Sequence, residues 1–416
     1  MEVQIGQTVV ERFLRYVKYD TQSADNATTY PSTQKQKDLG RQLVKELSEM
    51  GLNDASIDEF GYVTASLPAN VQRSIPTIGF IAHMDTSPEV SGKDVNPQIH
   101  ENYSGNDIIL PGDNTQVLRA SENSDLAKKI GDGLITSDGT TLLGADDKAG
   151  VAEIVDAMHY LAHHPEIEHG TIKVAFTPDE EVGAGVDHFN AQRFDAKYAY
   201  TLDGETLGEV ENETFSADSL TITFRGVPFH PGYARGRLVN SIKVASAFVD
   251  KLPKDGNSPE TTDRMEGFVH PNVIQGGVDN TSVKFIIRDF EDGGLRRKEE
   301  ALRALADETV RGFPNSSFTF KVDESYRNMR HILDKYPQVV EKAMDAVRKA
   351  GLQPKLHSIR GGTDGARLCY MGLPTPNLAT GGHNFHSRVE WISIQDMKKA
   401  VEIIVNLVKL WSIVTA

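Results

Sequence analysis

Histidine and acidic side chains stand directly after apolar segments at widely separated points of this 416-residue chain. His83 and Asp85 follow the apolar segment 76–82, and Asp203 follows the apolar segment 198–202. Histidine together with Asp or Glu is a ligand set suited to zinc and similar divalent metal ions. Carboxylates gathered without a cation repel one another and become protonated, and a metal ion removes that penalty. The pattern therefore indicates metal-assisted chemistry.

Three further pairs of polar residues extend this pattern: Asp146 and Asp147, Glu180 and Glu181, and His383 and His386. Each pair alone has a plainer explanation. A carboxylate after a strand usually caps a helix or lies solvated in a loop, and Asp146 or Asp147 would suffice to cap a helix starting at residue 148. A loop histidine is more often a surface residue than a ligand. The metal hypothesis is favoured because several such sites occur together without a compensating lysine cluster.

The elements that must position these residues alternate between strands and helices. Buried strands are predicted at 76–82, 171–176 and 198–202, and helices at 7–18, 34–50 and 149–161. This alternation is typical of an α/β domain whose central, mostly parallel sheet is flanked by helices. Ligands of such sheets bind beyond the carboxyl ends of the strands, which is where the polar residues stand.

A second domain is indicated by a change of pattern near residue 214. From 214 to 325 the predicted order is strand, helix, two strands, helix and strand, which is the ferredoxin-like α+β arrangement. Long helices and apolar segments resume from about residue 326. We therefore expect a lid domain at 214–325, inserted into a catalytic domain made of 1–213 and 326–416.

Composition limits the partners and the location of the protein. The chain has 44 basic and 59 acidic residues, and its net charge of −15 disfavours nucleic acid or a membrane surface as partner. No apolar run approaches the roughly 18 residues of a membrane-spanning helix, and the first residues lack the pattern of a signal peptide. The single cysteine, Cys369, suits a reducing compartment. We expect a soluble, cytoplasmic protein.

The polar groups also match a known set of motifs. HMDT at 83–86, LGADDKAG at 143–150, PDEEVG at 178–183 and NFH at 384–386 stand in the required order. They resemble the four site motifs of the dinuclear zinc exopeptidases, a family that includes carboxypeptidase G and acetylornithine deacetylase. Further segments, among them YPST at 30–33 and IRGGTDG at 359–365, resemble the tripeptide aminopeptidases of this family. The resemblance covers essentially the whole chain.

The resemblance implies five protein ligands for two zinc ions, for which Co²⁺ or Mn²⁺ are expected substitutes. Asp146 would bridge the two ions, His83 and Asp203 would complete the ligands of one ion, and Glu181 and His386 those of the other.

Catalytic and substrate-binding residues follow from the same resemblance. Glu180 would be the general base acting on a water that bridges the ions, and Asp85 would orient His83. His383 falls where the family varies and is left outside the ligand set. Positions that hold an oxyanion or a substrate carboxylate in the family match His230, Asn280, Arg288 and, in a glycine-rich loop, Arg360.

The implied activity is release of the N-terminal residue from tripeptides, with the lid closing over a short peptide. A dipeptidase, a carboxypeptidase or an N-acyl amino acid deacylase of the same family would use the same ligands. A silent binding protein with this fold is a further alternative, and the complete set of ligands with Glu180 speaks against it. The resemblance is also compatible with a homodimer.

Overall fold

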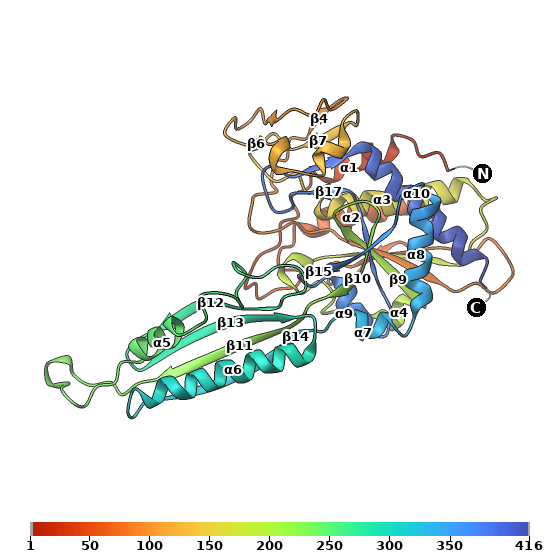
Figure 1. Ribbon diagram of the computed structural model, residues 1–416. Helices are drawn as coiled ribbons and strands as arrows, with labels where there is room; N and C mark the ends of the chain where they lie inside the picture. Colours follow the sequence, from red (N-terminus) through yellow and green to blue (C-terminus); the bar gives the residue numbers. More distant parts are fainter. Residues whose placement is uncertain (1–2, 415–416) are drawn as a thin grey trace. The chain divides into compact units, whose positions relative to one another are not determined.

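A computed structural model describes residues 3–414, and the chain divides into two compact units (Figure 1). The first unit consists of the chain up to Asn212, the segment Met329–His357 and the chain from Thr363 onward. The second unit consists of Glu213–Asn328 together with Ser358–Gly362. Nothing in the sequence pattern predicts that Ser358–Gly362 belongs to the second unit.

The first unit is built on an eight-stranded sheet with the order β1-β2-β8-β3-β9-β16-β10-β15. Its strands are β1 (Ser56–Ile57), β2 (Val63–Leu67), β3 (Ile78–His83), β8 (Ile172–Thr177), β9 (Tyr198–Gly204), β10 (Glu209–Thr214), β15 (Lys355–Ile359) and β16 (Asn377–Ala379). The central strands β8, β3, β9 and β16 run parallel, whereas β1, β2 and β10 pair antiparallel with their neighbours. The predicted sheet with a parallel centre is confirmed.

Both faces of this sheet are covered by helices. On β3, Phe80 and Ala82 belong to a large core, while Ile81 between them belongs to a smaller one. The large core includes residues of α1 (Thr8–Tyr16), α2 (Gln36–Glu49), α3 (Ala145–His163), α8 (Pro337–Lys349) and α10 (Ile394–Ser412). The smaller core includes residues of α4 (Ala191–Phe194) and α9 (Asp364–Tyr370), and α7 (Arg330–Leu333) contacts α8 and α9. Successive strand residues face opposite sides, so β3 is buried along its whole length and reads as one apolar run.

The first unit also contains short strands that the sequence analysis did not predict. Four of them form a sheet in the order β17-β18-β7-β4, and two more pair separately as β5 and β6. They are β4 (Gln98–His100), β5 (Ile108–Ile109), β6 (Val117–Leu118), β7 (Leu134–Thr136), β17 (Gly382–His383) and β18 (Trp391–Ser393). Segments of two or three residues are too short to show a period, which is why pattern reasoning overlooked them.

The second unit has the predicted ferredoxin-like order of elements. Its antiparallel sheet is ordered β12-β13-β11-β14, and α5 and α6 pack on the same strands and on each other (Figure 1). The elements are β11 (Ser216–Arg225), α5 (Ser241–Asp250), β12 (Phe268–Gly276), β13 (Asn280–Asp289), α6 (Asp292–Arg311) and β14 (Ser317–Tyr326). Leu220, Ile222 and Phe224 alternate along β11 and form part of the core of this unit. Among residues 3–414, no helix has both the length and the apolar character needed to cross a membrane.

Candidate metal centre

The polar residues singled out in the first unit lie where three neighbouring strands of its sheet end. His83 is the last residue of β3, Asp203 lies near the end of β9, and the 3-10 turn η3 (Glu180–Val182) follows β8. Asp146 stands in the first turn of α3, and His386 follows the short strand β17. Segments far apart in the sequence therefore deliver their side chains to one place, the carboxyl edge of a parallel sheet.

The carboxylate of Asp146 contacts two histidines, one through each oxygen. Its Oδ1 lies 2.9 Å from Nε2 of His83, and its Oδ2 lies 3.1 Å from Nε2 of His386. Asp203 Oδ1 lies 3.4 Å from the same nitrogen of His83, and Glu181 Oε2 lies 2.8 Å from that of His386. The five residues thus form two groups of donor atoms that share Asp146. A carboxylate that bridges two cations needs this arrangement.

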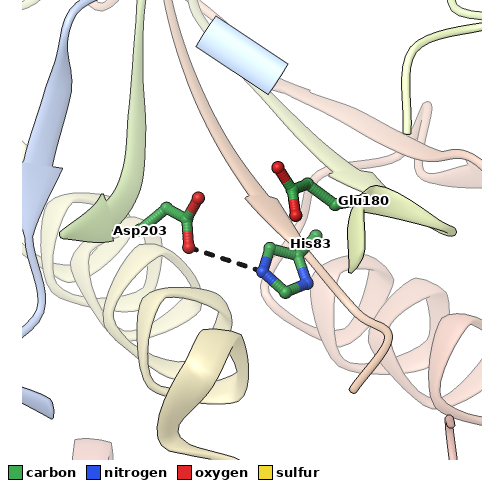
Figure 2. Close-up of side chains that lie close together, drawn as sticks. All are labelled: His83, Glu180 and Asp203. Carbon is green, nitrogen blue, oxygen red and sulfur yellow. Dashed lines mark ion pairs between the residues drawn. The ribbon is translucent and has the colours of Figure 1, made fainter. Parts of the chain in front are cut away.

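The donor atoms lie close enough together to hold divalent cations. One atom each from His83, Glu180 and Asp203 lie within 4.8 Å of one another, and Figure 2 shows these side chains gathered at the strand ends. The same holds for His83, Asp146 and Glu181. Glu181 Oε1 is buried and has no hydrogen-bond partner within residues 3–414, a state that costs about 1–3 kcal/mol. A cation would satisfy that oxygen, so the residues fit a metal site.

Without a cation, burial strongly perturbs the acids of this cluster. Burial and the charge of Asp146 raise the pKa of Glu181 to about 8, and burial raises the pKa of Asp203 to about 6. Burial and the charge of Asp203 raise the pKa of Glu180 well above its usual range. Hydrogen bonds to Asp146 and Glu181 raise the pKa of His386 to about 11. The protons that these raised pKa values retain on the carboxyl groups and on His386 are those that a bound cation would displace.

Asp85 supports both a histidine and the turn that carries the glutamates. Nδ1 of His83 lies 3.1 Å from the carbonyl oxygen of Asp85 and 3.4 Å from its Oδ1. The two carboxylate oxygens of Asp85 also accept the backbone N–H groups of Glu180, at 3.0 Å, and Glu181, at 3.2 Å. Only the contact with His83 was expected from the sequence. The fully buried Asp85 therefore links β3 to the turn after β8.

The start of α3 is held close to the sheet by the second aspartate and a glycine of the same motif. Asp147 Oδ2 accepts the backbone N–H of His83 at 3.0 Å. A Cβ atom on Gly150 would lie 2.2 Å from the carbonyl oxygen of Leu202, so only glycine permits this close approach to β9. Gly144 occupies the cap position of α3 and so has no side chain of its own to cap the helix. Asp147 thus joins α3 to β3, a role that sequence reasoning missed because its motif was interpreted only as a ligand or a cap.

The remaining histidine of the NFH loop is not part of this cluster. His383 is buried, and its ring stacks on that of Trp391 with the centroids 4.4 Å apart. Burial lowers the pKa of His383 to about 4. A neutral imidazole packed against an indole is a core residue, in keeping with its omission from the expected ligands.

Two of the expected substrate-binding residues are exposed in the second unit. His230 precedes a short 3-10 turn and accepts the backbone N–H of Gly232 at its Nδ1, 3.2 Å away. Asn280 opens β13 and donates its side-chain amide to Asp279. In both cases the hydrogen-bond partner lies within two residues in the sequence, so neither side chain is held by a distant part of the chain through these contacts.

The two arginines expected to bind substrate differ in whether their guanidinium groups already have hydrogen-bond partners. Arg288 is half-buried on β13, with its guanidinium carbon 5.0 Å from the centre of the Tyr326 ring. No carboxylate within residues 3–414 lies within ion-pair distance of it. Arg360 instead donates to the backbone carbonyls of Thr262, Arg264 and Glu266. Its charged group therefore holds the loop 262–266 inside the second unit.

Comparison with known proteins places these residues in context. Residues 133–410 match the sequence profile of peptidase family M20/M25/M40. Peptidase T of Caldanaerobacter subterraneus subsp. tengcongensis is 52% identical over 403 residues, which cover 97% of this chain and 98% of that relative.

Solved structures extend the likeness to the fold. Aminopeptidase PepT of Bacillus cereus superposes with a TM-score of 0.74 at 25% identity, covering 98% of this chain and 99% of that one. The YXEP protein of Bacillus subtilis, described as a dinuclear metal binding peptidase from the M20 family, gives a TM-score of 0.63 at 15% identity over 97% of this chain and 99% of that one. At 15% identity, the likeness to the YXEP protein concerns the fold alone.

Proposed function

Because this chain belongs to peptidase family M20/M25/M40 and is a metallopeptidase, we propose that it is an aminopeptidase that releases the N-terminal residue of tripeptides. Within the family, the motifs resemble those of peptidase T most. The alignment with a peptidase T over 97% of this chain confirms that resemblance. The tripeptide preference is carried by this likeness, since the metal ligands alone would equally serve related dipeptidases, carboxypeptidases and deacylases. The single free cysteine and the acidic composition support action in the cytoplasm.

The proposed cofactor is a pair of zinc ions, with Co²⁺ or Mn²⁺ as substitutes. We assign Asp146 as the bridging ligand, His83 and Asp203 to one ion, and Glu181 and His386 to the other. The observation that supports this assignment is that each oxygen of Asp146 faces a different histidine. Three carboxylates nearly balance two divalent ions in charge, which would keep the ions bound while leaving them electrophilic.

The mechanism assigns separate tasks to the adjacent glutamates. When bound, divalent ions would polarise the peptide carbonyl as Lewis acids and would lower the pKa of water, so that hydroxide is available as the nucleophile near neutral pH. Glu181 contacts His386, and we assign Glu180, whose carboxylate lies near His83 and Asp203, to take the proton of the attacking water and deliver it to the leaving amine. Asp85 holds the backbone of both residues and so keeps this base in position.

Recognition of the peptide is assigned to the second unit. Arg288 has no carboxylate partner in the part of the chain described here, and a guanidinium of this kind can bind the terminal carboxylate of a peptide through two parallel hydrogen bonds. His230 and Asn280 are exposed and can donate to peptide oxygens. Arg360 would have to release backbone carbonyls before it could bind a peptide, because its donors already bind those of the loop 262–266.

The experiment that tests this function compares products from Ala-Ala-Ala and its N-acetylated counterpart. We expect free alanine and Ala-Ala from the first peptide and no cleavage of the second, because an aminopeptidase requires the free α-ammonium group. Activity should disappear with a chelator and return with Zn²⁺ or Co²⁺. Cleavage of the acetylated peptide would contradict the proposal, because a carboxypeptidase or a deacylase accepts a blocked N-terminus and an aminopeptidase does not.

A further inference from the structure

Glu390 is a buried carboxylate that contacts the segment carrying Asp146. Its side chain is 1% exposed, and its Oε2 accepts the backbone N–H groups of Leu143 and Gly144, both at 2.8 Å. Its Oε1 accepts the backbone N–H of Asp146 itself at 3.0 Å. One side chain thus binds three backbone donors of the LGAD segment.

These donors need a partner because helix α3 does not supply one. The first N–H groups of a helix have no intrahelical acceptor, and a negative group is favoured near a helix N-terminus. The backbone of Asp146, with φ −83° and ψ 106°, is not helical although it lies in the first turn, and Gly144 has a φ of +83°. Regular helical hydrogen bonding therefore does not hold the backbone of Asp146 in place, and its N–H binds Glu390 instead.

The same side chain is tied to the other metal-ligand segment through the chain itself. Glu390 lies four residues after His386, and the turn between them is closed by its own hydrogen bonds. Ser387 Oγ donates to the carbonyl of Asn384 at 2.7 Å, and the Asn384 side chain donates to the carbonyl of Val389 at 3.2 Å. A displacement of Glu390 would therefore shift the positions of both Asp146 and His386.

We propose that Glu390 is a positioning residue that sets the Asp146 carboxylate against His386 and thereby tunes binding of the cation they share. This inference rests on the metal centre of the proposed function. Replacing a residue that hydrogen-bonds a metal ligand typically changes metal affinity by 10- to 100-fold. Glu390 acts on a ligand through its backbone rather than through its side chain.

The variant Glu390→Gln keeps the shape and removes one acceptor oxygen. Its amide oxygen can serve either the pair Leu143 and Gly144 or Asp146, and the NH₂ group then faces a donor on the other side. Glu46→Gln is the matched control. Glu46 is also buried, at 7% exposure, and accepts hydrogen bonds from Tyr16 and Arg15 between α1 and α2.

The test titrates the metal-free full-length chain and both variants with Zn²⁺ against a chromophoric chelator, and records thermal unfolding of each metal-free form. The visible spectrum of the Co²⁺-loaded proteins reports the ligand geometry. We expect Glu390→Gln to bind one ion about 10- to 100-fold more weakly, with an altered Co²⁺ spectrum, while Glu46→Gln binds both ions as wild type does. The metal-free melting temperature should fall no further in Glu390→Gln than in the control.

Wild-type affinity and spectrum in Glu390→Gln would overturn the inference, as would an equal loss of affinity in Glu46→Gln. If metal-free Glu390→Gln does not fold, Glu390→Asp takes its place, because it keeps the charge and shortens the reach by one methylene. Failure of both to fold where Glu46→Gln folds would assign Glu390 to the fold and refute a positioning role. A wild-type chain that binds no metal would instead contradict the proposed function.

Discussion

The metal centre and the lid residues differ in how firmly the chain holds them. His83 and Asp85 are buried, and hydrogen bonds fix their backbone or side chains from α3 and the turn after β8. His230 and Asn280 are exposed and contact only neighbouring residues of their own segment. Ligands that must meet a cation at fixed distances require a rigid support. The fold itself supplies that support to the candidate metal ligands, whereas the residues proposed for peptide recognition contact only their own segment.

The largest effect on turnover is expected when Glu180, the proposed general base of the metal centre, is replaced. Glu180→Gln should retain the metals and lower kcat by about 10²- to 10⁴-fold, because an amide cannot accept the proton of the attacking water. Metal content and steady-state turnover of the variant check this. Near-normal turnover by a fully metal-loaded Glu180→Gln protein would remove Glu180 from the role of base.

A smaller loss is expected when the support of the centre is weakened. Asp85→Asn should reduce metal affinity or kcat by about 10- to 100-fold, since the amide keeps only one acceptor oxygen for two backbone N–H groups and the His83 ring. Asn280→Ala in the second unit serves as the contrasting variant and should leave metal affinity at the wild-type value. Equal losses of metal affinity in both variants would show that the two regions do not differ as described.

Metal affinity is expected to depend on pH in the window set by the perturbed acids. Burial raises the pKa of Glu181 from 4.5 to about 8 and that of Asp203 from 3.8 to about 6. A group with a raised pKa in the folded state stabilises the metal-free protein at low pH, and that stabilisation is lost as the pH rises through the folded value. Metal must displace these protons, so affinity should rise by up to about tenfold per pH unit for each proton displaced between about pH 6 and 8.

Calorimetric titration with Zn²⁺ in buffers of different ionisation enthalpy measures the protons released on binding. The part of the release that comes from Glu181 and Asp203 should diminish toward pH 8 and above as these acids become ionised in the metal-free form, whereas the proton of His386, whose pKa is raised to about 11, is still released there. An affinity that is flat across the window, with no proton release, would show that these acids do not contact the ions.

The smallest effect is expected in the recognition region. Arg288→Ala should raise KM for free tripeptides about tenfold, which corresponds to about 1.4 kcal/mol, and should leave their C-terminal amides unaffected. Kinetics on matched acid and amide substrates measure the difference. Equal losses on both substrates would show that Arg288 does not bind the terminal carboxylate.

The parts of the molecule that were predictable from sequence are those with strong local patterns. The apolar run before His83 indicated β3, and the alternation of Leu220, Ile222 and Phe224 indicated the lid sheet. The short strands around β7 and β18 were missed because two or three residues carry no period.

Other features depend on contacts that no local pattern encodes. Glu390 accepts hydrogen bonds from backbone N–H groups nearly 250 positions earlier in the chain. Because almost every residue has a backbone N–H, the sequence does not indicate which segment supplies these donors. Arg360 was expected near an anion, yet it binds carbonyls of a loop about 95 residues earlier in the chain. Hydrogen bonds from a side chain to a distant backbone become visible only in three dimensions.

The central claim is that Asp146 bridges two cations, and a crystal structure of the zinc-loaded protein tests it most directly. Anomalous scattering recorded at the zinc edge should give two peaks flanking the Asp146 carboxylate, one next to His83 and one next to His386. A single peak, or two peaks that do not contact Asp146, would contradict the account.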